Sequence, residues 1–198
     1  QNVEWKETLE STGIPTAYFE VNDFADYLNM LEICTELTGK KELYEQYGLE
    51  VQKQIDAVIA ESQKRLENSE APTVLTMRAS ASSILAKNSE STVLGEILLD
   101  LGCINIADSD DSLLENLSME KILQLDPDHI FFIQRGDDTE GMKAYIESFL
   151  GEHPAWAQLS AVKEGRVHIV DKSLFGLKPN HRWGEAYEAA EEILRDET

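Results

Sequence analysis

Three of the six arginines in this chain follow segments that are predicted to be β-strands. Arg78 and Arg135 come directly after two such segments, and Arg182 lies in the loop 175–183 that follows a third. Guanidinium groups hold anions through forked, charge-assisted hydrogen bonds. Because parallel strands present their carboxyl ends along one edge of a sheet, we expect these arginines to converge there on an anionic ligand.

The loop 175–183 carries other groups that could contact the same ligand. Lys178 and His181 would add hydrogen-bond donors, and Phe175 and Trp183 would add flat apolar contact. The alternative is that each arginine pairs with a neighbouring acid and that Trp183 packs its own helix. The predicted ligand-binding residues are Arg78, Ser80, Arg135, Phe175, Lys178, His181, Arg182 and Trp183.

The composition excludes several classes of function. The chain has 38 acidic against 17 basic residues and a net charge of −21, whereas a nucleic-acid-binding protein needs a basic surface to neutralise phosphates. The same charge argues against binding to anionic membranes. No run of 18 apolar residues occurs, so no segment is predicted to span a membrane. Cys34 and Cys103 lie in apolar patterns and are interpreted as core thiols.

Sequence motifs of catalysis and metal binding are missing. No glycine-rich phosphate loop follows a predicted strand, and neither a nucleophile elbow nor an HExxH motif occurs. The histidines are dispersed, and only His181 is placed to touch a ligand. Asp108, Asp110 and Asp111 resemble part of a calcium loop, but the glycine and the closing glutamate are misplaced, so we interpret them as a solvated turn. We therefore expect a protein that is not an enzyme, with no metal site and no intrinsic cofactor.

From residue 72 onward, short apolar strands alternate with amphipathic helices. Strands are predicted at 73–77, 103–107, 129–133 and 166–170, and helices at 91–101, 119–125, 139–150, 154–159 and 180–195. The segment 78–83 is predicted to be a loop of small residues. The strand at 129–133 is apolar on both faces, which is typical of the middle of a parallel sheet. The pattern predicts a four-stranded, mainly parallel, doubly wound α/β layer.

A long helix is predicted over residues 40–68, which contain one glycine and no proline. Apolar residues recur along it at steps of three or four, and charged residues occupy the opposite face. At about 1.5 Å per residue it would be roughly 43 Å long. Such a rod is either half of a coiled coil or a beam between two globular bodies, and Gly48 and Ser62 in the apolar stripe favour the beam.

Upstream of this helix, residues 13–21 are predicted to form a short buried strand, and residues 22–37 a helix with Asn22 or Asp23 at its cap. A strand needs a partner, and none is predicted before the end of the long helix. We therefore expect the chain to be a piece of a longer protein that lacks part of its fold upstream. Apolar area left uncovered in this way tends to be buried by self-association, which we expect here.

Four blocks of sequence between residues 72 and 195 resemble a known family. They are LSME at 117–120, LDPDHI at 125–130, PAWAQLSAVKEGRVH at 154–168 and LKPNHRWGEAY at 177–187. In order and spacing they are similar to the substrate-binding proteins of ABC importers for iron complexes, haem and cobalamin. The last block looks like the iron-complex branch found in Gram-positive bacteria. Members of that family have two α/β lobes joined by one long helix.

The resemblance implies a division of the chain and a role for it. Residues 1–38 would be the end of an N-terminal lobe, 39–69 the interlobe helix and 70–198 the C-terminal ligand-binding lobe. The protein would capture a ferric siderophore or haem outside the cytoplasm and deliver it to an ABC permease. It would be periplasmic or anchored by a lipid to the outer face of a Gram-positive membrane. Ligand contacts from the rest of the N-terminal lobe would be absent.

Other functions stay open from the sequence. Within the same family, the chain could bind a corrinoid. An enzyme or a metallocluster protein could use the same bilobal architecture, since a fold does not determine a function. The acidic surface could also serve a scaffold that binds another protein. A panel of ligands tested by tryptophan fluorescence would separate these possibilities.

Overall fold

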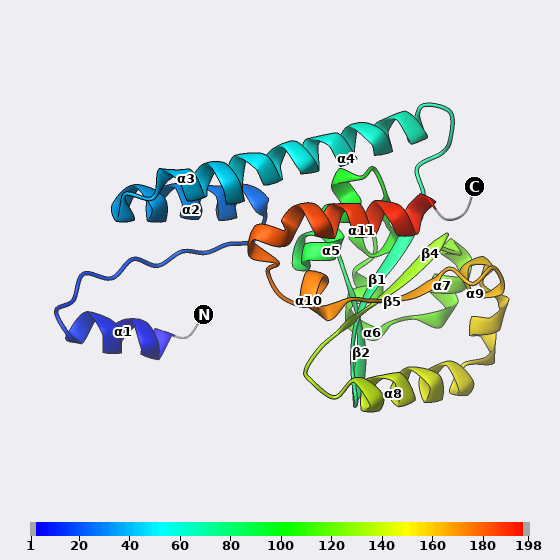
Figure 1. Cartoon of the computed structure of the whole chain (residues 1–198). Coiled ribbons are helices and arrows are strands. Elements are labelled where there is room, and N and C mark those ends of the chain that lie inside the picture. Colours follow the sequence, from blue (N-terminus) through cyan, green and yellow to red (C-terminus); the bar gives the residue numbers. More distant parts are fainter. Residues whose placement is uncertain (1–2, 196–198) are drawn as a thin grey trace.

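The computed structural model describes residues 3–195 and places a five-stranded sheet in the body of the molecule (Figure 1). The strands are β1 Thr73–Ser80, β2 Ser83–Lys87, β3 Ile104–Asn105, β4 His129–Gln134 and β5 Val167–Val170. Their order is β2-β1-β4-β5, and β3 pairs with the start of β1. β1 runs antiparallel to β2 and parallel to β3 and β4, and β5 continues the sheet parallel to β4. The predicted α/β class with a mainly parallel sheet is confirmed.

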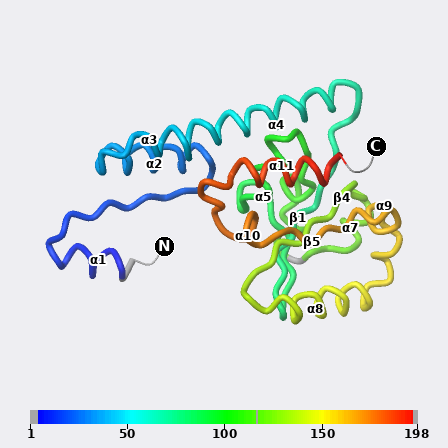
Figure 2. The backbone as a smooth tube through the Cα atoms, in the orientation of Figure 1, coloured from blue at the N-terminus to red at the C-terminus, as the bar shows by residue number. Residues whose placement is uncertain are grey.

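Helices cover both faces of this sheet, as the backbone trace shows (Figure 2). The α-helices are α1 Val3–Ser11, α2 Phe24–Thr38, α3 Lys41–Tyr44, α4 Glu50–Leu66, α5 Val93–Asp100, α6 Asp111–Asn116, α7 Met119–Leu125, α8 Thr139–Glu152, α9 Ser160–Lys163, α10 Lys172–Phe175 and α11 Trp183–Arg195. One core lies between the sheet and α2, α4, α5 and α11, and the other lies under α6, α7 and α8. Because side chains alternate along a strand, Val74 belongs to the first core and Leu75 to the second.

Several helix boundaries lie where the sequence predicts them. The side chains of Asp23, Thr92 and Ser118 accept hydrogen bonds from backbone N–H groups in the first turns of α2, α5 and α7. Gly39 ends α2 with a φ of 69°, a left-handed conformation that glycine adopts without strain. These local signals are short-range, and for that reason they can be recognised from the sequence alone.

The long helix is continuous from Lys41 to Leu66, but it contains a π-helical turn at Glu45–Leu49. The prediction of an uninterrupted α-helix is therefore wrong at this turn. A Cβ atom at Gly48 would lie 2.8 Å from Cδ1 of Leu28, so glycine lets α2 pack closely here without displacing that side chain. The apolar stripe beyond the turn is confirmed, because four of its members are buried: Val51, Ile55, Val58 and Ser62.

Two predictions near the N-terminus are wrong. The segment from Ile14 to Glu20 forms no strand, and the side chains of Ile14 and Tyr18 are 66% and 47% exposed. Among the described residues β1 is the first strand, and β2, β3 and β4 already occupy its two edges. The segment 14–20 therefore cannot pair with β1, and it is not part of the sheet. Cys34 is exposed, whereas Cys103 is buried as expected of a core thiol.

The segment 78–83 is not a loop, because β1 continues to Ser80 and the chain then turns directly into β2. Ser80 and Ser83 are paired across the turn, and their Oγ atoms lie 2.9 Å apart. Small residues fit such a tight connection. The sheet has five strands instead of four for this reason, although β3 is only two residues long.

A buried charge pair holds the long helix to α11. Arg65 on α4 donates from Nε and Nη2 to the two carboxylate oxygens of Glu191 on α11, at 3.0 and 3.2 Å. The same Nη2 donates to Oγ of Ser62, and that hydroxyl donates to the carbonyl oxygen of Leu101 just after α5. The Glu191 side chain is 3% exposed, so this forked pair is largely shielded from water.

We expect Glu191→Gln to lower the free energy of unfolding by about 2–4 kcal/mol, because Arg65 would lose its counter-charge in a shielded place. The same two helices offer a matched control, since Arg195 of α11 pairs with Glu61 of α4 where both side chains are more than half exposed. Glu61→Gln should cost less than about 1 kcal/mol. Urea denaturation of both variants tests this, and equal losses would contradict it.

Two histidines face each other across β4 and β5. Nδ1 of His129 lies 3.3 Å from Nε2 of His168, and the His129 ring stacks on Phe131. Burial, and next the neighbouring His168 and Arg166, lower the pKa of His129 to about 4. His129 is therefore neutral in the folded protein at neutral pH.

Lowering the pH should decrease the free energy of unfolding, because His129 is protonated more readily in the unfolded chain than in the folded protein. Its pKa is about 4 when folded and 6.5 when unfolded, so its contribution to stability is complete above pH 6.5 and declines as the pH falls toward 4. Burial raises the pKa of Glu96 to about 7, which acts in the opposite direction over an overlapping range. His129→Phe keeps a flat ring in the stack and removes the titrating group. In urea denaturation at several pH values, the free energy of unfolding of His129→Phe should fall on acidification by about 1–3 kcal/mol less than that of wild type. If the two proteins show the same dependence of this free energy on pH, the prediction is wrong.

Candidate functional site

Three basic residues line one pocket of about 280 Å³ on the sheet. The pocket is formed by Arg78 of β1, by Ser83, Leu85 and Lys87 of β2, and by Arg135 directly after β4. Three strands therefore contribute to it, although β2 and β4 are separated by more than 40 positions in the sequence. The predicted meeting of Arg78 and Arg135 is present in the structure.

Strand register brings these side chains together. Arg78 lies opposite Leu85 on β2 and opposite Ile133 on β4, and directly opposed residues point to the same face of a sheet. Side chains alternate, so Lys87 shares the face of Leu85, and Arg135 shares that of Ile133. The backbone N–H of Arg135 donates to the carbonyl of Ala79 at 2.7 Å, which fixes the end of β4 beside β1.

The three cations have no acidic partner among residues 3–195. No side-chain hydrogen bond or ion pair holds Arg78, Lys87 or Arg135 to any of the described residues. Elsewhere basic side chains are paired: Arg65 with Glu191, for example, and Arg182 with Glu185. In a chain with a net charge of −21, an unpaired group of three cations is an arrangement suited to an external anion.

The loop 175–183 does not line this pocket. Phe175 is 2% exposed and Trp183 is 1% exposed, so both are core residues and neither can stack on a ligand in this structure. The reason is that α10 begins directly after β5 and turns its apolar side inward. His181 is exposed and lies against the ring of Tyr47, with the ring centroids 5.4 Å apart.

The polar residues predicted from this region have protein partners. Nζ of Lys178 donates to the carbonyl oxygen of Asn22 at 2.6 Å. Arg182 donates to Glu185 and to Oγ of Ser173, as in the alternative that it only pairs with a neighbouring acid. Of the eight predicted residues, Arg78 and Arg135 thus line the pocket, and Ser80 lies beside it, opposite Ser83 in the turn.

The prediction missed Lys87 and the other pocket residues of β2. The cause is the mistaken loop at 78–83, which hid the strand that follows it. The sequence carries only a partial signal, because Ile84 and Ala86 alternate with the polar Ser83 and Lys87 but the apolar Leu85 interrupts the pattern. In the structure Ile84 and Ala86 are buried and Leu85 is exposed. Such alternation is typical of a strand with one face toward solvent.

Groups of metal ligands and membrane-spanning helices are both absent from residues 3–195. Within that range, no three or more His, Cys, Asp or Glu side chains are grouped so that they could hold a metal ion. Over the same residues, every helix is too short or too polar to cross a membrane. Asp110, in the predicted acidic turn, caps α6, and Asp108 accepts hydrogen bonds from Ser89.

Sequence and structure comparisons give a consistent set of matches. A family model described as periplasmic binding protein matches residues 3–174. An iron-uptake system-binding protein of Bacillus subtilis is 40% identical over 52 residues, a stretch that covers 26% of this chain and 16% of that protein. The chain thus spans well under two thirds of this curated relative.

Solved structures share the fold over almost the whole chain. IsdE of S. aureus, complexed with heme, has a TM-score of 0.78 at 16% identity, over 97% of this chain and 72% of that one. An ABC transporter substrate-binding protein of Listeria monocytogenes has a TM-score of 0.74 at 21% identity, over 98% and 73%. A periplasmic heme-binding protein of Pseudomonas aeruginosa has a TM-score of 0.72 at 22% identity, over 97% and 67%.

The placement of Phe175 in the core predicts a loss of stability when it is truncated. Phe175→Ala should lower the free energy of unfolding by about 3–5 kcal/mol, because it removes a buried ring and leaves a cavity. Leu177→Ala, two residues on and 76% exposed, should change it by less than about 0.5 kcal/mol. Urea denaturation of the two variants measures the difference. A Phe175→Ala variant as stable as Leu177→Ala would show that the ring does not support the core.

Proposed function

Because this chain belongs to the periplasmic binding protein family, we propose that it is the non-catalytic binding component of an ABC importer for an anionic iron complex. The complex would be a ferric siderophore or haem, which the protein delivers to a membrane permease. The observation that supports the anionic ligand is the unpaired group of Arg78, Lys87 and Arg135. The names of several similar proteins, which bind heme or take part in iron uptake, support the choice of iron.

The proposal assigns a part to each region of the chain. Residues 70–198 form the lobe that carries the basic pocket, 39–69 form the helix that joins it to a second lobe, and 1–38 belong to that second lobe. The packing of α2 against the far end of the long helix supports this division, because Tyr27 donates from its hydroxyl to the carbonyl of Tyr47. Figure 1 shows α2 under one end of this helix and α11 under the other.

The charge of the pocket favours a ligand with several anionic oxygens. Carboxylate, catecholate and propionate oxygens would each accept charge-assisted hydrogen bonds, worth roughly 1.5–3 kcal/mol where water is excluded. Arg135 is exposed, so solvent and salt reach this pocket, and each contact is worth less than that range. One wall of this kind would bind weakly by itself and would gain affinity from a second wall that closes over the ligand.

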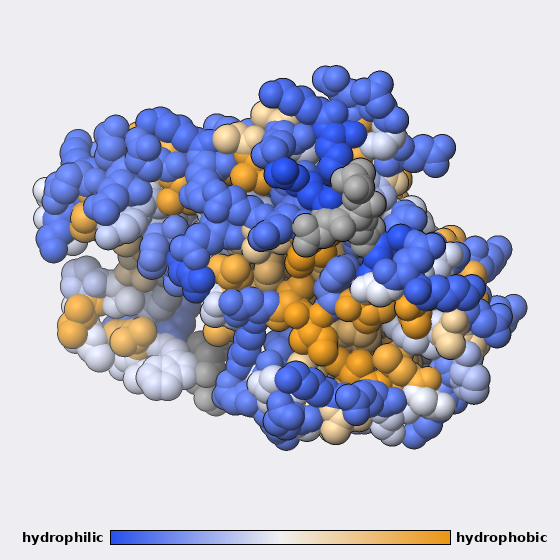
Figure 3. Space-filling view, turned by 45° about the vertical axis from the view of Figure 1, so that its right-hand side comes forward, coloured by the Kyte–Doolittle hydropathy of each residue, from blue (hydrophilic) through white to orange (hydrophobic). Residues whose placement is uncertain are grey.

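The remaining parts of the proposal concern place and assembly. Such a protein works outside the cytoplasm, in the periplasm or held by a lipid at the outer face of a Gram-positive membrane. Self-association of this chain is also proposed, because Trp5, Ile14 and Leu37 are each more than 60% exposed. Figure 3 shows apolar residues at the surface between hydrophilic ones, on one face of the molecule.

The ligand proposal predicts a specific loss of affinity. In titrations followed by tryptophan fluorescence, Arg135→Ala and Arg78→Ala should each weaken haem or an anionic ferric tricatecholate about tenfold or more, which corresponds to roughly 1.4 kcal/mol. Added salt should weaken binding as well.

Two controls make the result specific. Arg182→Ala removes an arginine that is paired with Glu185 and does not line the pocket, so it should leave affinity unchanged. An uncharged ferric trihydroxamate should bind wild type and Arg135→Ala equally. Unchanged affinity for the anionic ligands in both pocket variants would refute the anionic site.

A further inference from the structure

A second pocket, of about 390 Å³, lies among α2, α4, α5 and α11 and shares no lining residue with the basic pocket. Its acidic lining residues are Asp23, Glu90, Glu96 and Asp100. Apolar groups from the long helix, Ile55 and Ile59, form another wall. The pocket is therefore negatively charged on one side and apolar on the other.

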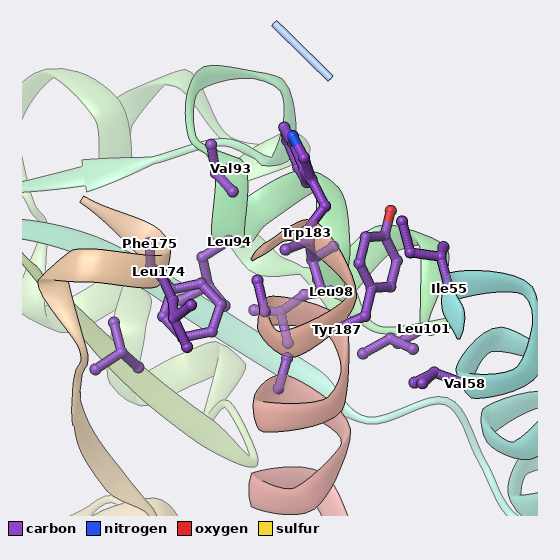
Figure 4. Packing of buried hydrophobic residues seen from close by; sticks show 14 of the residues in the cluster. Ile55, Val58, Val93, Leu94, Leu98, Leu101, Leu174, Phe175, Trp183 and Tyr187 are labelled. Carbon is purple, nitrogen blue, oxygen red and sulfur yellow. The ribbon is translucent and has the colours of Figure 1, made fainter. Parts of the chain in front are cut away.

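A buried donor in this pocket has no partner. The indole Nε1 of Trp183 lies in a side chain that is 1% exposed, and within the described residues nothing accepts its hydrogen. Trp183 lines the pocket together with Tyr187 from the next turn of α11. Figure 4 shows the two side chains next to each other, with the indole nitrogen and the tyrosine oxygen toward the same side. A buried donor without an acceptor costs free energy, so the pocket is suited to a group that accepts a hydrogen bond.

An acceptor in the same pocket is also without a partner. Oε2 of Glu96 is buried and forms no hydrogen bond within the described part of the chain. Two other carboxylates of the pocket are used by the protein, since Asp23 caps α2 and Asp100 accepts from the hydroxyl of Tyr187. Glu90 is exposed to solvent, so Glu96 is the carboxylate of this pocket with a buried oxygen that can receive a donor from a ligand.

A ligand that satisfies both groups must carry a hydrogen-bond donor and a hydrogen-bond acceptor. Glu96 needs a donor, best a cation, and Trp183 needs an acceptor. A bare metal ion does not meet both requirements, and the acids of the described residues are not grouped to hold one. A volume of about 390 Å³ is in the range of pockets for small organic ligands.

We propose that this acidic pocket binds a small organic cation, a primary amine that also carries a hydroxyl or carbonyl oxygen. The ammonium group would donate to Glu96, the oxygen would accept from Nε1 of Trp183, and the methylene groups between them would lie on the apolar wall formed by Ile55 and Ile59. This inference goes beyond the proposed iron-complex function and does not depend on it.

Binding of such an amine should be coupled to the loss of a proton from Glu96. Burial, and next the charge of Asp23, raise the pKa of Glu96 to about 7, so near neutral pH this carboxyl is only partly ionised. An ammonium group favours the ionised form and would expel the remaining proton. The charged and titratable groups around Glu96 are Asp23, Asp26, Glu90, Asp100, Lys178 and Tyr187. Lys178 acts against the acids by lowering the pKa of Glu96.

Calorimetric titration of the 198-residue chain with 5-aminopentan-1-ol tests the proposal. Pentane-1,5-diol, which has the same length and no charge, is the matched control ligand. We expect the amine to bind and the diol to bind at least about tenfold more weakly. Affinity for the amine should rise by up to about tenfold from pH 6 to pH 8, as Glu96 becomes ionised.

Variants locate the site. Glu96→Gln should weaken the amine about tenfold or more and remove the pH dependence, and Trp183→Phe should weaken it while leaving an aromatic ring in place. Glu70→Gln, the same charge change on an exposed residue outside the pocket, should leave binding unchanged. If Trp183→Phe fails to fold, Glu96→Gln and the pH series decide. Equal binding of amine and diol, no binding of the amine, or an unchanged affinity in Glu96→Gln would each overturn the proposal.

Discussion

The architecture depends on a contact between two acidic helices, the long helix and α11. Both carry several glutamates on their outer faces, and two such helices repel each other unless donors are placed between them. Three donors lie between these two helices. Arg65 meets Glu191 in a shielded position, Gln54 donates to Glu188, and Arg195 pairs with Glu61. Through Ser62 the buried pair also contacts the end of α5, so this pair ties the long helix to two other helices.

Short-range patterns allowed much of this fold to be predicted from sequence. The caps at Asp23 and Thr92 depend on residues three positions away, and the strand at 129–133 is fully buried as its apolar composition indicates. Features that depend on distant partners were missed. The π-helical turn occurs where α2 packs closely against Gly48. The sequence of residues 40–68 alone does not indicate where α2 packs, so the turn could not be predicted from it. The short turn between Ser80 and Ser83 has the composition of a loop, and this concealed β2.

The candidate site, too, was predicted from the sequence only in part. The rule that ligands lie at the carboxyl ends of parallel strands placed Arg78 and Arg135 at the same end of the sheet, because it depends only on topology. It did not predict that Arg78 lies within β1 and not in a loop after it. The rule could not predict whether the aromatic residues of the loop 175–183 are buried or contact a ligand. The sequence is the same in both cases. The rings of Phe175 and Trp183 are both buried, and neither lines the basic pocket. The family was recognisable because blocks such as 154–168 retain their order and spacing.

A basic pocket on a strongly acidic body has a consequence for the rates of binding. The net charge of −21 repels an approaching anion at long range, whereas the three cations attract it only within roughly 8 Å at physiological salt. Added salt screens the long-range repulsion, and it therefore speeds the encounter. The same salt weakens the contacts once they are made, and it therefore shortens the lifetime of the complex. An anion that binds in this pocket would therefore both associate and dissociate faster as ionic strength rises.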